Sequence, residues 1–111
     1  MKVTDIVQKL DLQVFSGHEG LGHEISGGYT SDLLSNVMGN ADAGNVWITI
    51  QTHRNVIAIA ALKELAAVIM PSDEKPGDDT VSQSNEEGIP ILGTGMPAFE
   101  LTGKLYDLLT K

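Results

Sequence analysis

The stretch GNVWITIQTHRNVIAIAALKELAAVIMP, Gly44 to Pro71, decides the fold of this chain. Val46–Gln51 alternates as a half-buried strand does, and Ala67–Met70 is short and fully apolar. Asn55–Leu65 lies between them and has helical length, with an apolar surface nearly all round. A strand, a helix and a second strand in this order predict a parallel crossover. The apolar helix predicts deep burial or a subunit interface.

Outward from this unit, helical and extended patterns continue to alternate, which is typical of a parallel sheet covered on both faces. The sequence therefore predicts a single α/β domain over residues 1–111, a three-layer α/β/α arrangement with a small, mainly parallel sheet. The remaining predicted elements are an N-terminal amphipathic helix capped by Thr4, a strand at Leu12–Phe15, a helix from Thr30–Asp32 to Gly39–Asn40, a helix at Thr80–Glu87, a strand at Ile89–Leu92 and a last helix after Pro97.

Composition excludes several classes of function. The net charge is −8, from 15 acidic and 7 basic residues, so attraction to nucleic acid or to an anionic membrane is not expected. No apolar run reaches the ~18 residues of a membrane span, and the N-terminus lacks a signal-peptide core, so we expect a cytoplasmic protein. The absence of cysteine removes disulfides, thiolate nucleophiles and Cys-ligated metal sites.

Two histidines, His18 and His23, lie in the sequence HEGLGHE. The zinc motif H-E-x-x-H places its histidines four residues apart on one helical face, whereas these are five apart and separated by Gly20 and Gly22. We therefore assign no metal ligands. Two alternatives stay open, a loop that brings both histidines to a metal and histidines that hydrogen-bond to the backbone.

No motif for catalysis is present. Gly27-Gly28 precedes a predicted helix start, where backbone N–H groups can hold an anion, but the phosphate-loop and dinucleotide-binding patterns are both missing. The alternative is a turn that needs a positive φ. Ser31 and Asp32 are adjacent, yet no G-x-S-x-G elbow carries them. We expect no catalytic residues, no cofactor and no enzyme activity.

The best candidate for a ligand site is Thr52-His53-Arg54-Asn55, between a predicted strand end and a helix start that Thr52 caps. In open α/β sheets ligands bind at this edge. Arg54 offers a planar fork for phosphate or carboxylate, and the helix start adds partial positive charge. The alternative is that Arg54 pairs with a carboxylate and His53 caps the sheet edge.

Thr94-Gly95 follows the predicted strand Ile89–Leu92 and precedes the last helix. In a parallel sheet this turn lies on the same edge as Thr52–Asn55, so the two loops are expected to form one cleft. The alternative is a plain strand-to-helix turn.

Four runs of the sequence are similar to the DRTGG domain family. They cover most of the chain and read GGYTSDLLSNVM, GNVWITIQTHRNVIAIAALKELAAVIM, EEGIPILGT and FELTGKLYDLL, between Gly27 and Leu109. The resemblance is to small stand-alone members, which are related to the N-terminal domain of HPr kinase/phosphorylase. The D-R-T-G-G string itself is not spelled here, and PSDEKPGDD stands where many relatives have a Thr-Gly-Gly turn.

The resemblance implies a layered α/β/α domain that is often dimeric, and it carries over only Arg54 and Thr94. Some relatives lie between CBS domains of regulated pyrophosphatases beside an adenine-nucleotide sensor. Stand-alone relatives occur in anaerobes, in some cases beside iron-hydrogenase genes. The kinase activity is not implied, because its phosphate loop and carboxylate belong to a separate domain.

The sequence thus leads to one hypothesis with two alternatives. We expect a homodimeric, non-catalytic regulatory domain that binds a small anionic ligand or a partner enzyme through Thr52, His53, Arg54, Asn55, Thr94 and Gly95. The first alternative is an adenine-nucleotide-binding module with Arg54 and His53 on phosphate. The second is an accessory protein for an anaerobic metalloenzyme such as an iron hydrogenase, with His18 and His23 as transient metal ligands.

Overall fold

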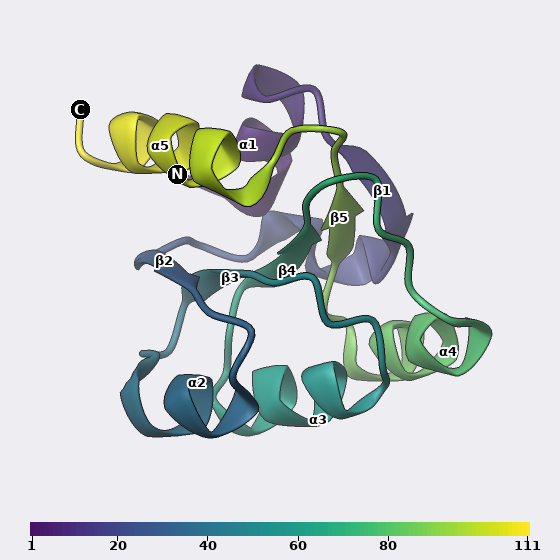
Figure 1. Ribbon diagram of the computed structural model, residues 1–111. Helices are drawn as coiled ribbons and strands as arrows, with labels where there is room; N and C mark the ends of the chain where they lie inside the picture. The colour runs from purple at the N-terminus through teal and green to yellow at the C-terminus, as the bar shows by residue number, and fades with distance from the viewer.

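The computed structural model describes residues 1–111 and alternates helices and strands along nearly the whole chain (Figure 1). In chain order the elements are α1 (Val3–Lys9), β1 (Gln13–Ser16), the 3₁₀ helix η1 (His18–Gly22), β2 (Gly27–Thr30), α2 (Leu34–Asn40), β3 (Asn45–Ile48), α3 (Asn55–Leu62), β4 (Ala67–Met70), α4 (Asp78–Glu87), β5 (Ile91–Gly93) and α5 (Ala98–Leu109).

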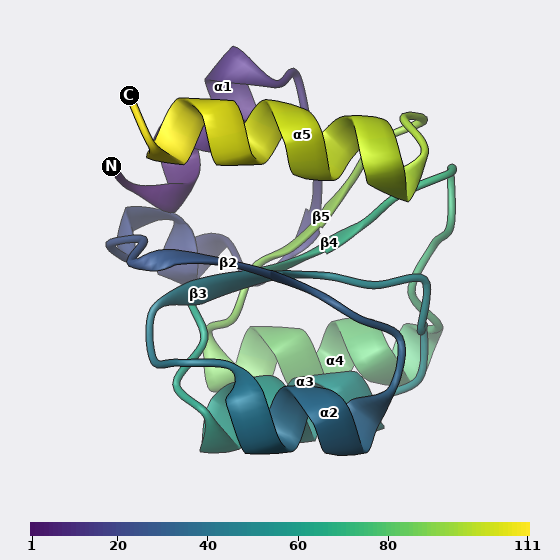
Figure 2. The ribbon, with the colours of Figure 1, turned by 60° about the vertical axis from the view of Figure 1, so that its left-hand side comes forward.

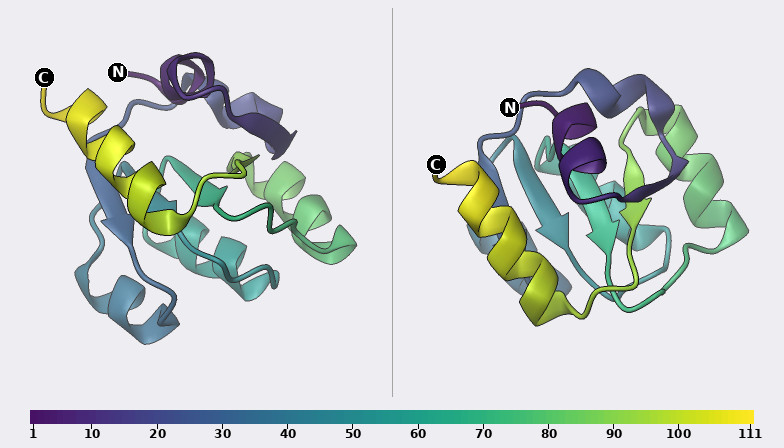
Figure 3. Two further views of the ribbon diagram at one scale, coloured as in Figure 1. Left: turned by 45° about the horizontal axis from the view of Figure 1, so that its top comes forward. Right: turned by 90° about the horizontal axis from the view of Figure 1, so that it is seen from above.

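The five strands form one sheet in the order β1-β5-β4-β3-β2. β2, β3, β4 and β5 run parallel, with Val46 opposite Ala67 and Ile69 opposite Leu92. Only β1, at one edge, is antiparallel to its neighbour. Figure 3 shows the strands from above, with α5 lying along β2. The predicted crossover from β3 through α3 to β4 is confirmed.

Helices cover both faces of the sheet, as the three-layer prediction requires (Figure 2). α2, α3 and α4 lie on one face, over a core cluster centred on Trp47, Ile57 and Val68. α1 and α5 lie on the other, over a second cluster that includes Ile6 and Leu101. The alternation within β3 decides these faces, because Trp47 belongs to the first cluster and Val46 and Ile48 to the second. No helix is long and apolar enough to cross a membrane.

The prediction of a turn at Gly27-Gly28 is wrong, because these residues begin β2. Neither glycine has a positive φ. The glycines with a positive φ are Gly17, Gly44 and Gly88. β2 pairs with β3 along its full length, from Gly27 opposite Asn45 to Thr30 opposite Ile48. A glycine pair carries little intrinsic strand preference, so this strand is formed by backbone pairing with its neighbour.

Three predicted helix starts are also corrected. α1 is capped at Lys2 and not at Thr4, and α2 begins at Leu34, after Thr30–Asp32. α3 begins after Arg54, without a side-chain cap from Thr52. The two longer predicted segments, Val46–Gln51 and Asn55–Leu65, end earlier, at Ile48 and Leu62. Tertiary hydrogen bonds hold two of these polar residues, since Asp32 accepts from Thr49 and Gln51 donates to the Asp32 carbonyl.

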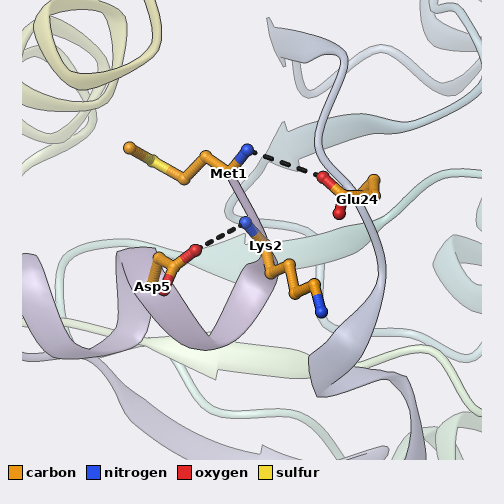
Figure 4. Close-up of polar contacts among 4 residues, drawn as sticks. All are labelled: Met1, Lys2, Asp5 and Glu24. Atoms are coloured by element: carbon orange, nitrogen blue, oxygen red, sulfur yellow. Dashed lines mark hydrogen bonds and ion pairs between the residues drawn. The ribbon is translucent and has the colours of Figure 1, made fainter.

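The first residues of the chain are held against the segment that follows η1 (Figure 4). The backbone N–H of Lys2 donates to Asp5 Oδ2 at 2.8 Å, which caps α1, and the N-terminal ammonium lies 3.5 Å from Glu24 Oε2. Val3 N–H donates to the carbonyl of His23, so backbone bonds reinforce the contact. The segment at His23 and Glu24 is therefore anchored to the start of α1.

Candidate functional site

The predicted site residues Thr52–Asn55 lie where the sequence places them, in the loop between the carboxyl end of β3 and the start of α3. The side chains of His53, Arg54 and Asn55 are exposed, and Thr52 is half-buried. The loop has a defined conformation because neighbouring elements hold its two ends.

Asp32, in the loop between β2 and α2, holds the first half. Its Oδ1 accepts from Thr49 Oγ1 at 2.9 Å and from the backbone N–H of Ile50 at 2.8 Å. The Gln51 side chain returns a bond to the Asp32 carbonyl at 3.1 Å. Asp32 therefore ties the β3–α3 loop to the loop of the adjacent strand, and its carboxylate is already engaged by two donors.

Thr80, on α4, holds the second half. Its hydroxyl donates to the Thr52 carbonyl at 2.8 Å, and the residue is 0% exposed. This bond fixes the backbone just before His53 and Arg54. The loop is thus fastened from both sides, and its exposed residues are presented in one arrangement.

Four consecutive backbone N–H groups in this loop, those of Thr52, His53, Arg54 and Asn55, donate to no backbone or side-chain acceptor. Unpaired N–H groups at a helix N-terminus, together with the helix dipole, favour an anion. Arg54, the only arginine of the chain, adds a full charge and a donor fork.

The alternative in which Arg54 pairs with a carboxylate is not found. The ion pairs of the structure join Met1 with Glu24, Lys104 with Glu100 and Lys111 with Asp107. Arg54 instead borders a shallow hollow of about 320 Å³ together with Asn55, Ala58 and Gln83, between α3 and α4.

Thr94 and Gly95 lie on the same edge of the sheet, but they line a different hollow. That hollow measures about 470 Å³ and includes Asp73, Glu74 and Lys75 from the β4–α4 loop. The expected single cleft is therefore wrong. β4 stands between β3 and β5 in the sheet, and its loop is joined to the β5 turn by bonds from Ser72 N–H to the Met96 carbonyl and from Asp73 N–H to the Thr94 carbonyl.

The two hollows also differ in charge. The Asp73 carboxylate lies against Gly95, where a Cβ would come within 3.3 Å of its Oδ1. Glu74 and Asp11 line the same hollow, so its three carboxylates outnumber its two lysines, Lys75 and Lys104. Anionic ligands are favoured at Arg54 over Thr94 and Gly95 for this reason.

The two histidines lie at opposite ends of η1. His18 begins η1, while His23 follows it with Nδ1 3.2 Å from the carbonyl oxygen of Ala66. For His23 this matches the alternative of a histidine bonded to the backbone. Nowhere in the structure do three or more His, Cys, Asp or Glu side chains gather as potential ligands of a metal ion.

The sequence predicted the position of the Arg54 loop but not the residues that hold its backbone, Asp32 and Thr80. Both were assigned to helix starts, since Asp and Thr are common there. Their bonds cross from one loop or helix to another, to Thr49 and Thr52 respectively, and no short-range pattern carries that information. The one sequence signal was the spacing of Thr80 and Ser84, which places both small hydroxyl residues on one face of a mostly polar helix, and both are buried.

Neither a protein-family model nor a curated protein sequence matches the chain. Among solved structures, it resembles the CBS and DRTGG domains of the regulatory region of Clostridium perfringens pyrophosphatase, a structure complexed with the activator diadenosine tetraphosphate. The TM-score is 0.69 and the sequence identity 12%, with 95% of this chain and 45% of that chain covered.

The likeness shows a fold in common and supports a DRTGG-like fold for this chain. This chain spans less than half of the regulatory region that it matches.

Proposed function

We propose that this chain is a non-catalytic regulatory domain that binds a small anionic ligand of the adenine-nucleotide class at the β3–α3 loop. The observation that supports it most is the fold shared with a pyrophosphatase regulatory region complexed with an adenine dinucleotide. At the carboxyl edge of the sheet, the unpaired N–H groups of residues 52–55 and the unpaired Arg54 side chain supply hydrogen-bond donors for a phosphate.

The charge of the chain indicates how such a ligand is held. With a net charge of −8, the protein as a whole repels anions, so binding must come from short-range donors and not from long-range attraction. Charge-assisted bonds to a guanidinium and to backbone N–H groups are the strong type. Removal of Arg54 should therefore weaken binding much more than removal of another cation.

The composition of the loop supports a binding role over catalysis. Arg54 only donates hydrogen bonds, the nearby Asp32 carboxylate already accepts from Thr49 and Ile50, and His53, the one side chain of the loop that can act as a general base, is exposed with no carboxylate paired to it. A general base in an active site is normally oriented by such a partner group. The ligand would accordingly be bound and released unchanged.

A thermal-shift screen against adenine and guanine nucleotides, diadenosine polyphosphates, cyclic dinucleotides and inorganic phosphate tests this proposal. A ligand at ~100 times its Kd adds about 2.7 kcal/mol to the free energy of unfolding, which is roughly 10 °C in Tm for a domain of this size. We expect the adenine compounds to raise Tm, and Arg54→Ala to abolish the shift.

Lys63→Ala is the matched control, because this substitution removes the same positive charge at the other end of α3. A shift that survives in Arg54→Ala would move the ligand away from this loop. No shift with any nucleotide would defeat the ligand-binding proposal and favour docking on a partner enzyme.

A further inference from the structure

β2 leaves one edge of the sheet open. It is the last strand in the order and pairs only with β3, so its outer backbone groups have no strand partner (Figure 1). Natural edge strands are protected by being very short, or by a charge, a proline or a bulge; β2 is short, at four residues, but has none of the other three devices. The sequence Gly27-Gly28-Tyr29-Thr30 contains no charge or proline, and its pairing with β3 is regular.

A groove of about 390 Å³ runs beside this edge, between β2 and α5. One wall is the consecutive segment 26–30, and Ile48 contributes from β3. The other wall is a single stripe of α5, whose members recur at helical spacing of three and four residues: Thr102, Leu105, Tyr106, Leu109 and Thr110. The groove therefore follows the length of the strand.

Gly28 keeps the groove open. A Cβ at this position would face α5, 3.5 Å from Leu105 Cδ2 and 4.0 Å from Leu109 Cδ1, which is ordinary contact. Tyr29 turns its ring to the opposite face, where its hydroxyl donates to Asn36 Oδ1 at 2.6 Å. A bond of 2.9 Å between the hydroxyls of Thr30 and Thr102 closes one end.

The lining has an unusual composition for this acidic protein. None of its eleven residues is charged, although 20% of the chain is, and its polar groups are hydroxyls and backbone. The fitting occupant is neutral, has apolar side chains, and brings backbone donors and acceptors for the open edge of β2.

We propose that β2 and α5 form a docking groove for an extended peptide segment of a partner protein. The segment adds to β2 as a sixth strand of the five-stranded sheet. Alternate side chains, apolar and uncharged, enter the groove against Leu105 and Leu109. Strand addition of this kind takes affinity from main-chain bonds and specificity from alternate side chains. The groove is separate from the Arg54 loop, so this proposal does not depend on nucleotide binding.

A second copy of this chain is a poor occupant. Its own β2 would present Gly28 and Thr30 to the groove, and these side chains are too small to fill about 390 Å³. A neutral small molecule fits the volume but leaves the strand edge without a partner strand.

The test is a selection of random seven-residue peptides displayed on phage against the purified chain, followed by affinity measurements on a selected synthetic peptide. Gly28→Val projects its methyl groups into the groove, and Gly28→Ala is the milder variant if the first is unstable. Gly22→Val is the control, because a Cβ at Gly22 has nothing within 4 Å. A copy of the peptide N-methylated at alternate residues blocks strand addition without altering the protein.

We expect selected sequences with apolar residues at alternate positions and no charge. Binding should weaken on the order of ten-fold or more in Gly28→Val and with the N-methylated peptide, whose backbone bonds are blocked, but not in Gly22→Val. Amide NMR shifts should concentrate at residues 26–30 and along α5.

Three results would overturn the proposal. The first is no enrichment of any peptide. The second is a peptide that binds Gly28→Val or survives N-methylation unchanged, which would make the groove a pocket for side chains or small molecules alone. The third is a concentration-dependent doubling of mass that Gly28→Val abolishes, which would identify a second copy as the occupant.

Discussion

At the scale of the residue, Gly17 has the strictest requirement in the chain. It adopts φ 71°, and a Cβ there would collide with the carbonyl group of Ile89. Its N–H also donates to Asn85 Oδ1 at 2.8 Å, so the backbone cannot move freely away.

We expect Gly17→Ala to lower the free energy of unfolding by about 2–4 kcal/mol, from the left-handed backbone and the collision together. Gly22→Ala, with open space around its Cβ, should change it by less than about 0.5 kcal/mol. Urea unfolding midpoints measure both, and equal midpoints would show that the backbone at Gly17 adapts at little cost.

Thr80 links stability to the candidate site through one hydroxyl. Thr80→Val keeps the shape but leaves the part-buried Thr52 carbonyl without its hydroxyl donor, which should cost about 1–2 kcal/mol. Because the same bond fixes the loop before Arg54, nucleotide-induced stabilisation should fall as well. Ser82→Ala, an exposed change on the same helix, is the control for both measurements. An unaltered ligand response in Thr80→Val would show that the loop holds its conformation without this bond.

The site was predictable from the sequence only in part. Arg54 could be placed because a strand end followed by a helix start is a local pattern, and the loop lies there. Whether this loop and Thr94-Gly95 share one cleft could not be predicted, because the answer depends on the order of strands in the sheet. With β4 between β3 and β5, the acidic β4–α4 loop separates the two.

At the scale of the element, segments with a strong apolar period were predicted well. α5, predicted as a helix after Pro97, has Leu101 and Leu105 buried, with Leu108 and Leu109 packed beside them. β4 has its predicted bounds, Ala67–Met70. β2 was missed because Gly-Gly-Tyr-Thr has no such period, and only its neighbour β3 makes it a strand. Prediction from local pattern fails where backbone pairing replaces side-chain burial.

The packing of α5 gives a prediction at this scale. Leu101 is 0% exposed and packs in the core cluster between α5 and the sheet. Leu101→Ala should therefore lower the free energy of unfolding by about 2–5 kcal/mol, through lost burial and the cavity that it leaves. Phe99→Ala on the same helix, at a residue 92% exposed, should have little effect. Chemical unfolding compares them, and a large loss in Phe99→Ala would instead reveal a partner surface at that side chain.

At the scale of the whole molecule, the predicted homodimer has to be reconsidered against the packing of α3. Val56, Ile57, Ile59 and Ala60 are buried within the single chain, so most of the apolar surface that suggested an interface is already covered. The exposed apolar residues of α3 are Ala58 and Leu62, and Leu62, the larger, is 68% exposed.

We retain the homodimer as a prediction with a sharper test. Light scattering at low concentration should give a mass of twice 11.8 kDa, and Leu62→Glu should return it to 11.8 kDa if α3 forms the contact. A dimer that persists in Leu62→Glu would place the contact elsewhere. A monomer in both proteins would remove the dimer altogether.

The pairing of β1 with β5 has a consequence for the time course of synthesis. Gln13 lies opposite Gly93, so nearly the whole domain separates the two strands along the chain. At 5–20 residues per second, β1 waits roughly 4–16 s on the ribosome before its partner exists. Until β5 is synthesised, the edge of β4 that pairs with β5 in the finished sheet also has no partner strand. A nascent chain stalled before β5 would therefore expose two strand edges at once to neighbouring nascent chains.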